Sequence, residues 1–88
     1  MILDKERFMN AAKIEEDDPY VDILLPHVQA LCMDVARAQT EEELAGMPEA
    51  ETALLYAAVY LYENRANADY LKLMKMLRQI LMSRNPAF

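Results

Sequence analysis

One stretch of the chain, positions 53–62, contains no glycine, proline or charged residue. The pattern predicts a helix over residues 48–65, with Pro48 at its first position, where the missing N–H costs nothing. Arg65 would lie near the C-terminus of this helix and interact favourably with its dipole, by about 0.3–1 kcal/mol. Because such a helix is apolar on almost every side, other helices or other chains must cover it.

The segment before this central helix shows the periodicity of an amphipathic helix. Asp18 supplies the N-cap and Pro19 the first position, and the helix extends to about Gln39. Pro26 lies off the apolar face, so we expect one continuous, kinked helix with Pro26 on its outer side. The apolar face consists of Val21, Leu24, Leu25, Val28, Leu31, Cys32 and Val35.

Capping residues predict short helical segments before and between these two helices. Asp4 can cap a short helix that ends near residue 13 or 14. Thr40 and Glu43 have the spacing of a capping box, which starts a turn or two of helix. Gly46 then provides a left-handed cap before the central helix.

A last helix follows, capped by Asn67 or Asp69. The sequence therefore predicts an all-α fold, a small bundle of four main helices in a single domain over residues 1–88. In this bundle the second helix is kinked and a short capped turn precedes the central helix. The expected core stripe of the last helix is Tyr70, Leu73, Met74, Leu77, Ile80 and Leu81.

Charge is distributed unevenly along the 88 residues, which carry a net charge of −6. Residues 1–51 hold 13 acidic and four basic residues, whereas residues 52–88 hold two acidic and five basic ones. Two interpretations stay open: the two halves attract each other within one fold, or they form complementary surfaces for head-to-tail contact between copies. The acidic balance argues against tight binding to a polyanion.

The residues that usually carry chemistry are sparse. His27 and Cys32 lie five residues apart, about 140° around a helix axis, which is too divergent for a shared metal or catalytic step. The acidic run at 15–18 lacks the glycine turn of a calcium loop, and we expect it to be solvated. No Gly-x-Ser-x-Gly elbow or glycine-rich phosphate loop occurs. We therefore expect no enzyme, no metal and no cofactor, and one cysteine excludes an internal disulfide.

The last helix carries a candidate interaction surface. Its basic residues recur at i, i+3 and i+6 and form a row along one side of the helix. This row could touch phosphates, but the acidic remainder of the chain favours a face that is solvated or that contacts another protomer. Large apolar residues fall outside the core stripe, and an aromatic residue in the tail could anchor in a partner pocket. The candidate interface residues of this region are Leu71, Lys72, Lys75, Met76, Arg78, Met82 and Phe88.

A family resemblance appears in the central helix. A proline-started helix of the form Pro-x-x-x-x-Ala-Leu-Leu that closes in Tyr62-Glu63-Asn64-Arg65 resembles the central helix of the phage head-tail connector (adaptor) family. The preceding short helix, acidic turn and long helix are similar in order. Ile80-Leu81-Met82-Ser83-Arg84 resembles the Leu-Leu-x-x-x-Arg-like tail of that family. The chain lacks a long loop between the second and the central helix.

The resemblance implies a non-enzymatic ring protein that joins the portal to the tail. Its partners would be copies of itself, the portal protein and a tail-completion protein, and DNA would pass through the lumen without specific binding. Tyr62 and Arg65 would fix the angle at which the last helix leaves the central one; their local roles are that Tyr62 packs and Arg65 caps the helix. The alternative is a small acidic helical regulator that binds one protein partner.

The expected location follows from the same interpretation, namely the head-tail interface of the virion, after synthesis in the cytoplasm of a bacterial host. The first residues show no basic region followed by an apolar one, so no signal peptide is expected. The longest apolar run is about half of the ~20 residues that a membrane span requires, so no membrane partner is expected.

Overall fold

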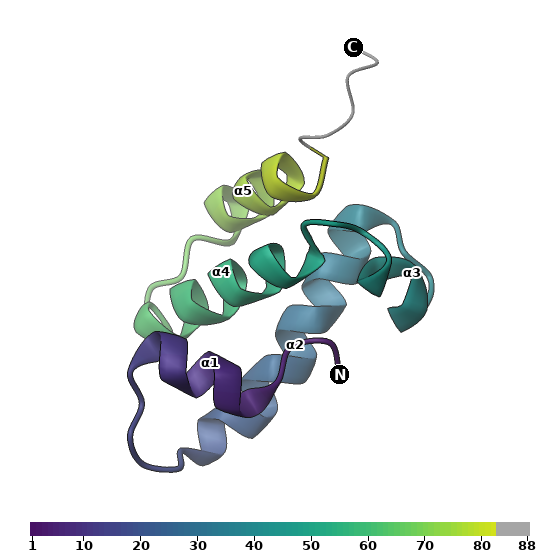
Figure 1. The fold of residues 1–88 in the computed structure, drawn as a ribbon. Coiled ribbons are helices and arrows are strands. Elements are labelled where there is room, and N and C mark those ends of the chain that lie inside the picture. The colour runs from purple at the N-terminus through teal and green to yellow at the C-terminus, as the bar shows by residue number, and fades with distance from the viewer. Residues whose placement is uncertain (83–88) are drawn as a thin grey trace.

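The computed structural model describes residues 1–82, and within this range it contains five helices and no strand (Figure 1). The all-α bundle of four main helices is thereby confirmed, with α3 as the short capped turn before the central helix. The helices are α1 (Lys5–Ala12), α2 (Pro19–Ala36), α3 (Glu41–Ala45), α4 (Ala50–Glu63) and α5 (Tyr70–Met82).

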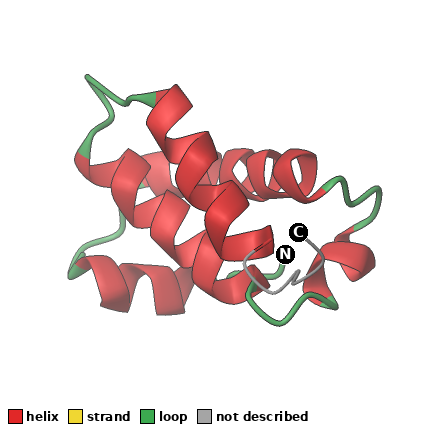
Figure 2. Ribbon diagram, turned by 90° about the horizontal axis from the view of Figure 1, so that it is seen from above, coloured by secondary structure: helices red, strands yellow, loops and turns green. Residues whose placement is uncertain are grey.

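The central helix α4 is flanked by three helices. In Figure 1 it lies between α1 and α5, and α2 crosses behind it. Short loops connect the helices, as the view from above shows (Figure 2). Apolar side chains from all five helices form a single core, and no polar or charged side chain among residues 1–82 is fully buried. The largest side chains in this core are Phe8, Leu44, Leu54, Leu61, Leu73 and Leu77.

The start of α2 agrees with the prediction, whereas its end at Ala36 comes before the predicted Gln39. Asp18 is its N-cap, and Oδ1 of Asp18 accepts a hydrogen bond from the Tyr20 N–H at 3.0 Å. The helix runs without a break through Pro26, which is exposed on the outer side. Six of the seven residues of the predicted apolar face are buried, and Leu31 is half-buried.

Two further predicted caps are present. The Thr40 hydroxyl accepts from the Glu43 N–H at 3.1 Å, and the Glu43 carboxylate reaches back to accept from the Gln39 N–H. Asp69, rather than Asn67, caps α5, since its Oδ1 accepts from the Lys72 N–H at 3.1 Å. These caps satisfy N–H groups that a helix N-terminus leaves without partners.

The bounds of the central helix differ from the prediction. It begins at Ala50, because a turn in which the Ala50 N–H donates to the Met47 carbonyl comes first and leaves Pro48 outside the helix. It ends at Glu63, so Arg65 lies beyond the last turn and does not cap it. The dipole interaction expected for Arg65 is therefore replaced by the ring contacts described below.

The left-handed cap predicted at Gly46 is wrong. Gly46 has φ −74° and ψ −11°, because its N–H donates to the Glu42 carbonyl and the chain continues in right-handed turns towards α4. Left-handed residues occur instead at Lys13 and Arg37, with φ of 60° and 57°. They end α1 and α2 in the paired backbone hydrogen bonds of a Schellman motif.

One residue of the predicted α5 core stripe does not belong to the core. Tyr70 is 45% exposed, because it lies in the first turn of α5 and its ring reaches the exposed His27. The Tyr70 hydroxyl and Nε2 of His27 are 3.2 Å apart. Leu73, Leu77 and Leu81 are buried as predicted, and Met74 and Ile80 are half-buried against the core.

Candidate interaction surfaces

Tyr62 and Arg65 lie at a corner where α1, α2 and α4 meet. The Tyr62 hydroxyl donates to Oδ2 of Asp18 at 3.0 Å. The ring of Tyr62 packs against that of Phe8, with 5.9 Å between centroids and 78° between the ring planes. The Arg65 guanidinium stacks over two rings, 4.6 Å from the centroid of Tyr20 and 5.1 Å from that of Tyr62. Such cation–π contacts stabilise by about 0.5–1 kcal/mol at exposed sites. The predicted packing of Tyr62 is confirmed.

The protonation states at this corner are fixed by the same contacts. The Tyr20 N–H and then the Tyr62 hydroxyl lower the pKa of Asp18 below its ordinary value, and the Arg65 charge acts in the same direction. The hydrogen bond to Asp18 raises the pKa of Tyr62. The carboxylate is therefore charged and the phenol neutral at neutral pH.

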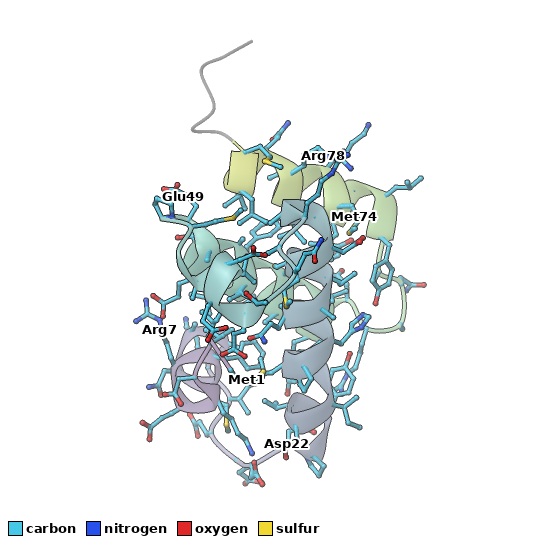
Figure 3. All side chains as sticks on the ribbon, turned by 90° about the vertical axis from the view of Figure 1, so that its right-hand side faces the viewer. Met1, Arg7, Asp22, Glu49, Met74 and Arg78 are labelled. Carbon is cyan, nitrogen blue, oxygen red and sulfur yellow. The ribbon has the colours of Figure 1, made fainter. Side chains whose placement is uncertain are left out.

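The outer face of α5 carries most of the predicted interface residues. Leu71, Lys75, Arg78 and Met82 follow one another at spacings of four, three and four residues, opposite the buried Leu73, Leu77 and Leu81. We call these four residues the α5 ridge. Leu71 is 81% exposed and Met82 36% exposed. Figure 3 shows Arg78 projecting away from the bundle.

The other predicted interface residues lie beside or outside this ridge. Lys72 is exposed on the flank of α5, and Met76 is half-buried. Phe88 lies outside the described residues. The structure thus brings Leu71, Lys75, Arg78 and Met82 together, and it places Tyr62 and Arg65 in a separate corner.

The ion pairs within residues 1–82 all lie in the acidic first part of the chain. Lys5 bridges Asp17 at 2.8 Å and Asp22 at 2.9 Å, and these two hydrogen bonds raise the pKa of Lys5. Arg7 meets Glu51 at 3.1 Å, and the amino group of Met1 meets Glu41, also at 3.1 Å. None of the described basic residues after position 51 makes an ion pair with a described acidic residue.

A groove runs along the outer side of α4 beside α1, and the sequence analysis did not locate it. It has a volume of about 480 Å³. Leu55 and Val59 are half-buried in it, and the rings of Tyr56 and Tyr60 stack on each other at 6.5 Å with 10° between their planes. We call this the α4 groove. Its lining residues are Arg7, Ala11, Glu51, Thr52, Leu55, Tyr56, Val59, Tyr60 and Glu63.

One feature of the sequence indicates that α4 has an uncovered side. A helix without charge between positions 53 and 62 requires cover on every side. Within residues 1–82, α1, α2, α3 and α5 contact α4 and leave the side of the groove open. Which side stays open depends on how the neighbouring helices pack. The periodicity of a single segment does not contain that information.

The described residues contain no candidate metal-binding cluster. No group of three or more histidine, cysteine or acidic side chains within residues 1–82 could hold a metal ion. His27 is exposed, whereas Cys32 is fully buried, and burial raises the pKa of its thiol to about 12. None of the helices in this part of the chain combines the length and apolar character needed to cross a membrane.

Comparison with protein-family models, with curated proteins and with solved structures finds no match to this chain.

Proposed function

We propose that this protein is a head-tail connector of a phage or prophage, a non-enzymatic ring component that joins the portal to the tail. The single observation that carries the proposal is that the basic side chains of α5 lack ion-pair partners within residues 1–82. These side chains are exposed, and the protein as a whole is strongly acidic. Two surfaces of opposite charge on one chain favour head-to-tail assembly, which forms a ring when the rotation between neighbouring copies closes.

The resemblance of residues 48–65 and 80–84 to connector proteins supports the same function. The Tyr62 and Arg65 pair stands where the chain leaves α4 towards α5, and it is held from two sides by Asp18 and the Tyr20 ring. A fixed corner there would set the direction of α5, and in a ring the direction of α5 would set the angle between neighbouring copies. The partners are then further copies, the portal protein and a tail-completion protein, at the head-tail interface of the virion.

The net charge of −6 fits a DNA passage. A lumen lined by acidic side chains repels the phosphate backbone, so the DNA slides through without specific binding. The basic residues of α5 are then engaged between copies.

The decisive experiment is co-expression with the portal protein encoded in the same gene cluster, followed by electron microscopy of the purified portal. We expect an additional ring of density on the tail-facing side of the portal, absent when the portal is expressed alone. Light scattering of the isolated protein should show association that increases with concentration and falls with added salt. A gene cluster without a portal gene, or a portal that stays bare beside a strictly monomeric or dimeric protein, would overturn the proposal in favour of the regulator.

A further inference from the structure

The α4 groove is an apolar surface that the described part of the chain leaves uncovered. Stacked Tyr56 and Tyr60 form one wall, and Leu55 and Val59 line the floor. Glu51 and Glu63 stand 12 residues apart along α4, a rise of about 18 Å at 1.5 Å per residue. The groove is therefore long enough for about three turns of a second helix.

The α5 ridge has matching dimensions. Leu71 and Met82 lie 11 residues apart, a rise of about 16–17 Å. Between these two apolar ends the ridge carries the charges of Lys75 and Arg78, neither of which has an ion-pair partner within residues 1–82. Glu63, at one end of the groove, also lacks an ion-pair partner there. Both surfaces thus offer apolar length. Glu51 of the groove is paired with Arg7, so Glu63 is the groove acid whose charge can meet that of the ridge.

The two surfaces cannot meet within one molecule. The groove is formed by α1 and α4, whereas the ridge lies on the side of α5 opposite its buried leucines. Figure 3 shows Arg7, on the groove side, and Arg78, on the ridge, projecting from different sides of the bundle. Contact between them therefore requires a second copy.

We infer that the α5 ridge of one copy docks into the α4 groove of the next. The contact joins two different patches, so each copy offers one groove and one ridge and the assembly continues head to tail. The apolar floor supplies the burial, and one of the two basic side chains, Lys75 or Arg78, pairs with Glu63 at one end of the groove. The inference deepens the proposed function and rests on it, since a closing series of such contacts is the ring of the connector.

Site-directed cross-linking tests the contact directly. In a Cys32→Ala background, Tyr56→Cys places a thiol at the middle of the groove, and Gln79→Cys places one beside the ridge while leaving every ridge residue in place. We expect a bismaleimide with a ~10 Å spacer to link a mixture of the two variants into dimers and to leave each variant alone uncoupled. Ala30→Cys, on the exposed side of α2, is the control partner and should not couple with Tyr56→Cys.

Charge reversal provides a second readout in the same assay. Lys75→Glu in the ridge should lower the yield of the mixed product by about tenfold, and Arg37→Glu, the same charge change elsewhere, should leave it unchanged. Added salt should also lower the yield. A yield that does not respond to Lys75→Glu would contradict the ridge as the occupant.

The outcomes separate the contact from the function. Absence of the mixed product, or coupling of Tyr56→Cys with itself, would overturn the groove–ridge contact, and rings on the portal would then be built on other surfaces. Coupling of the mixture together with a bare portal would support the contact and overturn the connector function. Binding of DNA through the ridge would instead appear as a mobility shift at low salt that Lys75→Glu abolishes, and with no mixed product it too would overturn the contact.

Discussion

The hydroxyl of Tyr62 donates to Oδ2 of Asp18 at 3.0 Å and ties the last turn of α4 to the N-cap of α2, 44 residues earlier in the sequence. Asp18 serves two elements at once, because its other oxygen accepts from the Tyr20 N–H. Arg65 closes the corner over the rings of Tyr20 and Tyr62. The entry of α2 and the exit of α4 are therefore held by one shared group.

Removal of the Tyr62 hydroxyl should loosen this corner. We expect Tyr62→Phe to lower the Tm by about 2–6 °C, because the Asp18 carboxylate loses a donor while the ring contacts remain. Tyr20→Phe is the matched control, since the hydroxyl of Tyr20 makes no hydrogen bond within residues 1–82 and its removal should leave the Tm unchanged. Equal Tm values for the two variants by circular dichroism would contradict the role of the bond.

The same carboxylate predicts a pH dependence. The Tyr20 N–H and the Tyr62 hydroxyl lower the pKa of Asp18 in the folded state, so near the ordinary value of 3.8 the unfolded chain binds more protons. The stabilisation is therefore complete above that value and is lost as the pH falls through the lowered pKa.

Asp18→Asn isolates this contribution, because asparagine also caps a helix and accepts a hydrogen bond but does not titrate. We expect the Tm of the native protein to fall more steeply than that of Asp18→Asn as the pH falls below the ordinary value of 3.8. The other carboxyl groups are shared by both proteins and cancel in the comparison. Parallel curves would show that Asp18 has the same pKa in the folded and unfolded states.

Local rules of the sequence were sufficient for the helices and for most of their caps. The spacing of the apolar residues of α2 and the caps at Asp18 and Thr40 depend on contacts between near neighbours in the chain, so they could be predicted. The ends of α4 could not, because the turn before Ala50 competes with the start at Pro48. Propensity alone does not decide between them.

The candidate surfaces divide in the same way. The exposure of Leu71, Lys75 and Arg78 could be predicted, since these residues fall opposite the buried stripe of a single helix. The grouping of the α5 ridge differs from the predicted row of Lys72, Lys75 and Arg78. The α4 groove depends on where α1 packs against α4, and the hydrogen bond between Tyr62 and Asp18 joins residues 44 positions apart. Contacts between segments that are distant in the sequence do not produce a periodic pattern within either segment.

Burial of Cys32 predicts low thiol reactivity. The side chain is fully buried, and burial raises the pKa of the thiol to about 12, so the reactive thiolate is rare at pH 8. We expect labelling by a maleimide or a disulfide reagent to be more than about 100-fold slower in the native protein than in guanidinium chloride. Cys32→Ala has no thiol and gives the background signal of the assay. Rapid labelling of the native protein would show that α2 opens readily at this position.

The left-handed residue that ends α2 offers a route to a more stable protein. Arg37 has φ 57°, a conformation that costs an L-residue about 1–2 kcal/mol, and its backbone N–H and that of Ala38 complete the Schellman motif. Glycine adopts this conformation without strain but loses more freedom on folding, so Arg37→Gly should raise the free energy of unfolding by about 0.5–1 kcal/mol. Arg37→Ala removes the same side chain and keeps the strain, so urea denaturation should show no gain for it. A gain of equal size in both variants would assign the effect to the arginine side chain and contradict the role of backbone strain.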